Sequence, residues 1–189
     1  MGRMPRTVYL FGSAAPPVLE IDRAVEGLRR RGWDVCLGLT PTAADWLDGR
    51  VGELEELTGH PVRSAYRRPG TADVWPRADV ILFAPATFNS INAWALGLTD
   101  RFVVGVVAEG IGRGIPTVAM PCVNAAYAQH TQFDLSVARL RSMRVEVLYG
   151  DGGFVPNQPG QRLPYPWERA FDAVERVSAG DRPGGGAIL

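Results

Sequence analysis

The sequence predicts an α/β protein in which a doubly wound parallel sheet of five or six strands is covered by helices on both faces. Short apolar runs of strand length alternate with amphipathic stretches of helical length, which is the pattern of successive βαβ units. The chain has 189 residues, 46% of them hydrophobic, so it can bury a core as one domain. We expect residues 1–180 to form that domain, and the Gly-rich residues 181–189 to be a disordered tail.

Local signals in the first half mark where helices begin and end. Pro16 and Pro17 suit the first turn of a helix, and Thr40 or Thr42 can cap the next one. A Gly-His-Pro sequence at 59–61 ends that second helix. The expected elements are a strand at 7–11, a helix at 16–31, a strand at 34–39, a helix from 40 or 42 to 57, and a short edge strand with a mobile loop at 62–76.

The second half begins with a run at 79–84 that, after Asp79, is apolar on both faces, as in a central parallel strand. The expected elements are this strand, helices at 89–98 and 100–108, a strand at 117–120, a helix at 125–143, a strand at 145–149 and a helix at 167–177. Residues 150–166 are rich in Gly, Pro, Asn and Gln and form a connection long enough to act as a lid.

Composition excludes several classes of function. All 20 basic residues are Arg and none is Lys, which excludes Schiff-base chemistry on a lysine and a P-loop. Charges balance at 20 basic and 20 acidic residues, so we expect no nucleic-acid partner. Two Cys without CxxC spacing and two His predict no metal site. The apolar runs are too short to span a membrane and no signal segment opens the chain, so we expect a cytoplasmic protein without a membrane partner.

In open parallel sheets, ligands bind outside the carboxyl ends of the strands, so the segments that follow the strands are informative. These segments offer small side chains, hydroxyls, amides and helix starts instead of acids or His. Such groups suit an anion such as a phosphate beside a planar polar ring, which describes a flavin mononucleotide (FMN) pocket. A single hydroxyl at a helix start usually does no more than cap the helix. The segments are 12–14, 40–42, 85–90, 121–124 and 150–153.

Three motifs resemble those of the homo-oligomeric flavin-containing cysteine decarboxylases. The run from Ala84 to Asp100 is similar to the family's Pro-Ala-Ser-Ala-Asn-Thr motif and the helix that follows it. The sequence Pro-Cys-Val-Asn at 121–124 resembles its Pro-x-Met-Asn motif, and Leu-Thr-Pro-Thr-Ala-Ala at 39–44 resembles its Leu-Thr-x-x-Ala segment. The similarity runs from about residue 7 to residue 149. The family includes phosphopantothenoylcysteine decarboxylases and enzymes that act on the C-terminal cysteine of peptide antibiotics.

This resemblance implies a flavodoxin-like (Rossmann-like) sheet and FMN held between the subunits of a homotrimer or a higher multiple. It implies a small-molecule or C-terminal peptide substrate whose cysteine β-carbon passes a hydride to the flavin before CO2 is lost. The thioaldehyde formed in this way is an electron sink that makes decarboxylation feasible. Asn124 would bind the substrate carboxylate. The residues that would contact or position the cofactor are Gly12, Ser13, Thr40, Pro85, Ala86, Thr87, Asn89, Ser90 and Asp100.

The sequence departs from the family pattern at the catalytic positions. In these decarboxylases a His lies fourteen residues before the first Pro of the motif, and that offset from Pro85 falls on Thr71, which cannot act as a general base. The family's Met-Trp pair is replaced by Tyr127 and Ala128, and the late loop lacks the Cys of the phosphopantothenoylcysteine enzymes.

Other chemistry-bearing residues have ordinary structural interpretations that we favour. His60 and His130 are more often structural or exposed than catalytic, and Cys122 is a thiol reactant or, more commonly, an inert buried thiol. The pair at Arg67 and Arg68 clamps an acidic substrate or is simply solvated. We expect the remaining candidates to be core or interface residues: Trp33, Trp46, Trp75 and Trp94.

Three functional hypotheses follow. The first is an FMN-dependent oxidative decarboxylase or oxidoreductase that acts on a cysteine-like or small carboxylate substrate, which Asn89 and Asn124 favour. The second is an FMN-binding regulatory or hetero-oligomer subunit without decarboxylase activity, which Thr71 favours. The third is a flavin prenyltransferase, which the absence of Lys disfavours.

Overall fold

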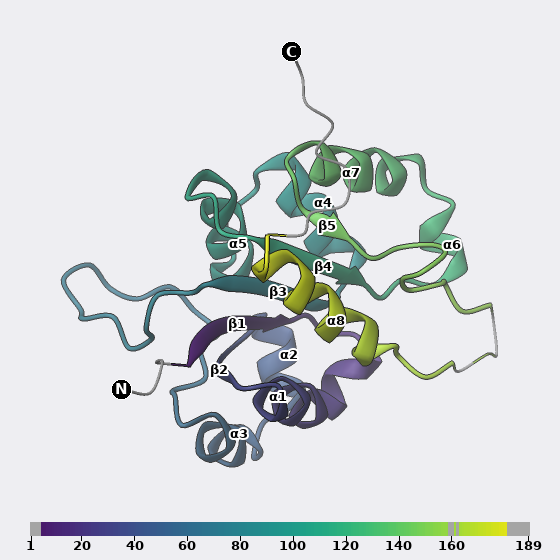
Figure 1. Cartoon of the computed structure of the whole chain (residues 1–189). Helices are drawn as coiled ribbons and strands as arrows, with labels where there is room; N and C mark the ends of the chain where they lie inside the picture. The colour runs from purple at the N-terminus through teal and green to yellow at the C-terminus, as the bar shows by residue number, and fades with distance from the viewer. Residues whose placement is uncertain (1–4, 159–160, 162, 181–189) are drawn as a thin grey trace.

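The computed structural model describes residues 5–158, 161 and 163–180 (Figure 1). Within them lies one five-stranded sheet in which every pair of neighbouring strands is parallel. Its order is β2-β1-β3-β4-β5, the flavodoxin-like order, so the predicted doubly wound α/β class is confirmed. The strands are β1 (Arg6–Gly12), β2 (Trp33–Leu39), β3 (Val80–Ala86), β4 (Thr117–Pro121) and β5 (Glu146–Val147).

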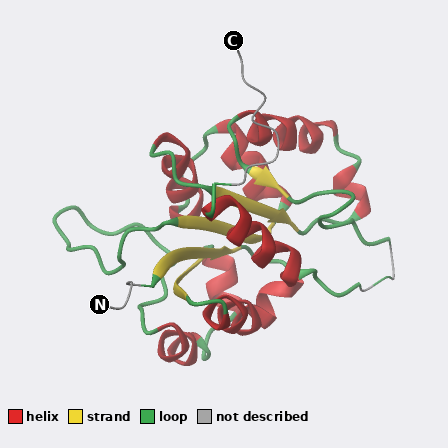
Figure 2. Ribbon diagram, in the orientation of Figure 1, coloured by secondary structure: helices red, strands yellow, loops and turns green. Residues whose placement is uncertain are grey.

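Helices cover the sheet on both faces (Figure 2). α1 and α8 pack against each other, α1 on β2 and α8 on β3 and β4, whereas α5 packs on β3 and β4. The crossover from β1 to β2 runs toward one edge of the sheet and the crossover from β3 to β4 runs toward the other. Because such crossovers are right-handed, α1 and α5 lie on opposite faces. The helices are η1 (Pro16–Glu20, 3-10), α1 (Ile21–Arg30), α2 (Pro41–Trp46), α3 (Val51–Thr58), α4 (Phe88–Leu96), α5 (Phe102–Gly112), α6 (Ala125–Ala128), α7 (Thr131–Ser142) and α8 (Trp167–Ser178).

Three of the expected helices are not continuous, which corrects the sequence prediction. The helix expected at 16–31 opens with the 3-10 turn η1 before α1 begins. The one expected at 40–57 is divided into α2 and α3, with Gly49 between them in the left-handed region at φ 82°. The one expected at 125–143 is divided at His130, whose ring accepts a hydrogen bond from the Gln132 N–H (3.1 Å) and caps α7. A 3-10 turn, a left-handed glycine and a side-chain cap interrupt these helices, and periodicity alone does not reveal such local features.

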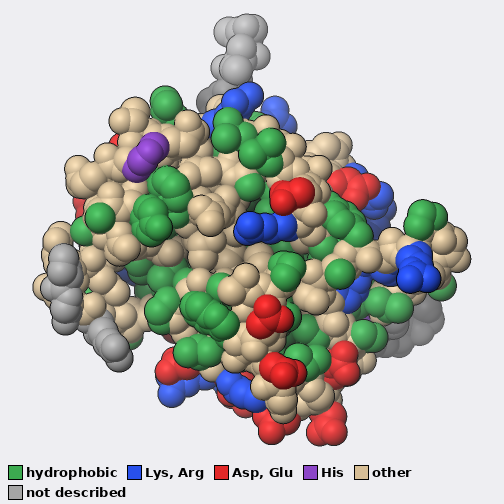
Figure 3. Space-filling view, turned by 180° about the vertical axis from the view of Figure 1, so that it is seen from behind, with side chains coloured by type: hydrophobic (Ala, Val, Ile, Leu, Met, Phe, Trp, Pro, Cys, Tyr) green, Lys and Arg blue, Asp and Glu red, His purple; other side chains and the backbone are tan. Residues whose placement is uncertain are grey.

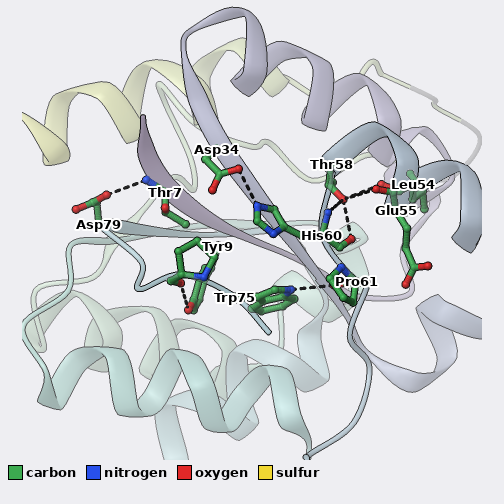
Figure 4. A network of polar contacts seen from close by, with 11 residues as sticks. Thr7, Tyr9, Asp34, Leu54, Glu55, Thr58, His60, Pro61, Trp75 and Asp79 are labelled. Carbon is green, nitrogen blue, oxygen red and sulfur yellow. Dashed lines mark hydrogen bonds and ion pairs between the residues drawn. The ribbon is translucent and has the colours of Figure 1, made fainter. Parts of the chain in front are cut away.

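Two strand predictions are also corrected. Residues 62–76 contain no edge strand, because only Arg63 bridges β2, at Gly38. Past that bridge the chain leaves the sheet and is stabilised by side chains: Arg67 donates to the Thr71 carbonyl oxygen (2.8 Å), and the Trp75 Nε1 donates to the Pro61 carbonyl oxygen (2.8 Å, Figure 4). The strand expected at 145–149 pairs only over β5, because the chain then turns and Tyr149 bridges Phe154.

The core lies on both sides of β3, all of whose residues are buried. One glycine is required for this packing: a Cβ on Gly27 would lie 2.4 Å from the Phe171 ring, so α1 and α8 could not approach as closely. Trp33, Trp75 and Trp94 are buried as expected, whereas Trp46 is 48% exposed. None of the described helices is long and apolar enough to cross a membrane. The predicted tail at 181–189 lies outside the described residues.

Candidate functional site

A cleft of about 610 Å³ opens at the carboxyl ends of the strands. Its walls come from the segments that follow β1, β2, β3 and β4, together with residues of the late loop and the start of α5. The size is that of a typical small-ligand site. The lining residues are Ala14, Ala15, Pro16, Thr40, Thr42, Trp46, Thr87, Phe88, Asn89, Ser90, Arg101, Cys122, Val123, Asn124, Tyr127, Phe154 and Asn157.

Three hydroxyls are linked at the floor of this cleft. The Ser13 and Ser90 Oγ atoms lie 2.7 Å apart, and the Thr87 hydroxyl donates to the Ser90 Oγ at 3.1 Å. Thr87 also caps α4, since its Oγ1 accepts the Ser90 N–H. The first turn of α4 therefore faces the cleft, and its N–H groups and positive dipole end favour an anion there.

Backbone hydrogen bonds between the strand ends bring these loops together. The Ser13 N–H donates to the Pro85 carbonyl oxygen (2.8 Å), and the Thr40 N–H donates to the Gly12 carbonyl oxygen (2.9 Å). The Cys122 N–H donates to the Ala86 carbonyl oxygen (2.9 Å). Gly12, Pro85 and Ala86 thus position the walls of the cleft without lining it.

Asn124 caps a helix and also lines the cleft. Its Oδ1 accepts the Tyr127 N–H at 2.8 Å and so caps α6, which leaves the Nδ2 donors for the cleft. Tyr127 in turn stacks on Phe88, with ring centroids 4.7 Å apart. The stacked rings of Phe88 and Tyr127 therefore lie next to the amide donors of Asn124.

The electrostatic character of the cleft favours an anionic ligand. Among the described lining residues there is no Asp, Glu or His, and Arg101 is the one charged side chain. Burial raises the pKa of the Cys122 thiol to about 11, so this thiol is protonated at neutral pH. The described lining residues therefore include no group that would act as a base near neutrality.

The structure brings together most of the residues singled out from the sequence. Thr40, Thr87, Asn89, Ser90 and Asn124 line the cleft, and Ser13 is buried just beneath it.

Two residues singled out from the sequence lie elsewhere. Asp100 is exposed between α4 and α5, and Thr71 lies in the exposed segment after Arg67, where its hydroxyl donates to the Arg68 carbonyl oxygen (2.8 Å). Neither residue lines the cleft of its own chain.

The lining residues that sequence reasoning missed include Trp46, Arg101, Phe154 and Asn157. The sequence predicts a core or interface position for Trp46, and Arg101 directly follows the last residue of the motif at 84–100. Phe154 and Asn157 belong to the loop at 150–166, for which the sequence predicts a lid. Its composition marked the loop as unusual, but no pattern within it pointed to these two residues.

The remaining candidates have structural partners. The His60 Nε2 lies 2.8 Å from the Asp34 Oδ1 (Figure 4), and the nearby Cys36 Sγ completes a group whose potential ligand atoms lie within 4.8 Å of one another. This group is formed by β2 and the segment after α3 and does not line the cleft. Arg67 binds the backbone of its own loop and pairs with Asp73.

The strand order defines a flavodoxin-like α/β protein, and its cleft lies at the carboxyl edge of the sheet, where ligands bind in such folds. The family model described as Flavoprotein matches residues 3–168, and the chain belongs to this family. No curated protein sequence matches the chain significantly.

Solved structures with the same fold include several flavin-related proteins. The FMN-dependent cysteine decarboxylase SpaF has 20% identity and a TM-score of 0.72, over 93% of this chain and 98% of that chain. The cypemycin decarboxylase CypD has 16% identity and a TM-score of 0.71, over 93% and 95%. AnUbiX (PadA1), solved with FMN and dimethylallyl pyrophosphate, has 13% identity and a TM-score of 0.66, over 98% and 100%.

Proposed function

We propose that this chain binds FMN in the cleft and oxidatively decarboxylates a substrate that ends in cysteine or a similar small carboxylate. The observation that carries the proposal is the pairing, in one cleft, of an anion-binding helix start at Thr87–Ser90 with the free amide donors of Asn124. Membership of the Flavoprotein family and the names of the similar structures support it.

The residues present fit a flavin phosphate and ring. The Ser13, Thr87 and Ser90 hydroxyls and the N–H groups of the first turn of α4 would hold the phosphate, and Asn89 lies in the same turn. Apolar and aromatic walls at Val123 and Phe88 would pack against the ring.

Bound FMN would supply the redox chemistry that side chains lack, by accepting two electrons from the substrate's β-carbon and thiol. The chain's own part is to orient the substrate. Asn124 would donate to the carboxylate through Nδ2 while Tyr127 fixes its other end. A neutral amide orients the carboxylate without opposing the loss of its charge as strongly as a guanidinium would.

A second function is favoured by a specific observation. The described lining residues include no titratable base near neutrality, and Thr71 stands where the cysteine decarboxylases carry a His. An FMN-binding regulatory or hetero-oligomer subunit would keep the cofactor cradle without needing that base.

We also propose that the chain assembles as a homotrimer or a higher multiple. Leu96 and Leu98, at the end of α4 and just beyond it, are 48% and 56% exposed. Hydrophobic side chains also lie among acidic and basic ones on the face turned away from the view of Figure 1 (Figure 3). Light scattering of the purified protein measures the assembly, and a monomer at all concentrations would contradict it.

The test of the two functions is direct. The visible spectrum of the purified protein, with mass determination of the molecule released on denaturation, decides whether FMN is bound. Incubation with a peptide ending in cysteine then decides between enzyme and subunit: an enzyme releases CO2 and leaves a product lighter by CO2 and two hydrogens. A colourless protein that cannot be reconstituted with FMN would contradict both.

The variant Thr71→His separates the alternatives further. CO2 release that appears only in this variant would show that the site is intact except for its base. Because Thr71 does not line its own cleft, such a gain would also require its loop to reach the cleft of another copy.

A further inference from the structure

A second amide side chain borders the cleft beside Asn124. Asn157 and Asn124 form a parallel bridge, and the Ala125 N–H donates to the Asn157 carbonyl oxygen at 3.3 Å. The two residues are distant in sequence, yet this bridge makes them neighbours, and both side chains line the cleft.

The orientation of the Asn157 amide follows from the cost of burying either its Oδ1 or its Nδ2 without a hydrogen-bond partner. Its Oδ1 is buried without a partner among the described residues, so Nδ2 is the polar end left for the cleft. The reverse orientation would bury an NH2 group, which has two donors to satisfy instead of one oxygen. Asn124 is oriented likewise, because the Tyr127 N–H requires an acceptor. Both amides therefore turn donors toward the cleft.

The loop that carries Asn157 is held by hydrogen bonds to its backbone. The Phe154 N–H donates to the Leu148 carbonyl oxygen (3.0 Å), and the Arg169 Nη1 donates to the Gly153 carbonyl oxygen (2.9 Å). These contacts fix the turn that precedes residue 157, and the bridge to Asn124 fixes the backbone at residue 157 itself, so the side chain is preorganised.

Two adjacent neutral donors, with no described acidic residue on the cleft wall, match the two oxygens of one carboxylate. We propose that Asn157 is a substrate-binding residue that holds the substrate's terminal carboxylate together with Asn124. This inference rests on the proposed function and deepens it, because it names a second residue that recognises the substrate's free carboxylate.

The test is a calorimetric titration of the purified protein with an unreactive peptide that ends in serine, which measures the affinity for the peptide. The same peptide with a C-terminal amide provides the comparison. We expect the wild type to prefer the carboxylate form. Asn157→Ala should weaken binding of the carboxylate form about tenfold and leave the amide form unchanged, as for one lost hydrogen bond to a charged group. Asn157→Asp should weaken it further, because an acceptor replaces the donor.

Gln158→Glu is the matched control. Gln158 is exposed and does not line the cleft, so the same added charge one residue away should leave both affinities unchanged. Melting curves of the variants exclude loss of fold.

Three results would overturn the inference: carboxylate binding in Asn157→Ala that equals the wild type, tighter carboxylate binding in Asn157→Asp, or a wild type that does not prefer the carboxylate form. The flavin content of each protein is measured separately. A flavin-free protein that still selects the carboxylate through Asn157 refutes the proposed function alone, whereas a flavin-loaded protein indifferent to residue 157 refutes this inference alone.

Discussion

The cleft differs from the network that joins β1 and β2 to the segment after α3 (Figure 4) in whether its polar groups have hydrogen-bond partners within the protein. In that network each group has a protein partner. The Tyr9 hydroxyl donates to the Pro76 carbonyl oxygen at 2.6 Å, the Trp75 Nε1 to the Pro61 carbonyl oxygen, and His60 pairs with Asp34. In the cleft, neither the Asn124 Nδ2 nor the Asn157 side chain has a hydrogen-bond partner among the described residues.

The difference separates groups that hold the fold from groups that serve a ligand. A buried polar group contributes to stability only when its partner is present, so a structural network satisfies itself. A ligand site keeps donors unsatisfied until the ligand arrives, at a cost in stability that the rest of the core offsets. Substitutions in the two regions should therefore affect different observables.

The largest effect is expected for Trp75→Ala. Trp75 is buried, its ring lies 5.0 Å from that of Tyr9, and Arg63 packs over it. Removing the ring should lower the free energy of unfolding by about 3–5 kcal/mol, as for other large core truncations. Urea unfolding measures it, and flavin content per folded protein should not change. Trp75→Phe, which keeps a ring but loses the Nε1 donor, should cost only about 1 kcal/mol.

Asn89→Asp should produce the opposite pattern. A carboxylate in the first turn of α4 favours the helix dipole, so the melting temperature should be kept or slightly raised. The same charge faces the bound phosphate of the proposed cofactor, and FMN affinity should fall about 100-fold, or about 2.7 kcal/mol. Absorbance at flavin wavelengths during reconstitution measures it. The control Gln129→Glu adds a charge outside the cleft, and full flavin occupancy in Asn89→Asp would refute this placement of the phosphate.

Tyr165→Phe tests a residue near the cleft that belongs to the structural class. Its buried hydroxyl donates to the Met120 carbonyl oxygen at 2.6 Å, and burial raises its pKa well above the usual value. Loss of this bond should destabilise the fold by about 1–2 kcal/mol without changing flavin affinity. Tyr127→Phe is the control, because Tyr127 is 53% exposed and its hydroxyl has no hydrogen-bond partner among the described residues. Equal melting temperatures for the two variants would contradict the distinction.

The two cysteines give the smallest effect, which is confined to alkaline pH. Burial, with Asp34 nearby, raises the pKa of Cys36 to about 12, and burial raises that of Cys122 to about 11, both from 9.0. The unfolded chain ionises first, so the free energy of unfolding should be independent of these thiols below about pH 9 and fall as pH rises through the folded values. Denaturant unfolding at several pH values measures the slope, and Cys36→Ala should flatten it. A slope that is unchanged in that variant would count against the shift.

The sequence by itself determined the class of the fold, because strand-length apolar runs alternating with amphipathic helices fit only a layered α/β sheet. It also determined the chemistry of most of the strand-end segments. Thr40, Thr87, Asn89 and Asn124 directly follow strands, and in a parallel sheet all carboxyl ends meet at one edge. These short-range signals needed no knowledge of distant contacts.

Only the tertiary structure decided how those segments combine. Asn157 reaches the cleft through a bridge to a residue far away in sequence, and Arg101 and Trp46 line it because of how α5 and α2 are placed. Thr71 could be aligned with a catalytic position, yet its segment leaves the sheet after Arg63 and carries it away from its own cleft. Contacts between distant segments set the positions of these residues relative to the cleft, and local sequence patterns do not predict such contacts.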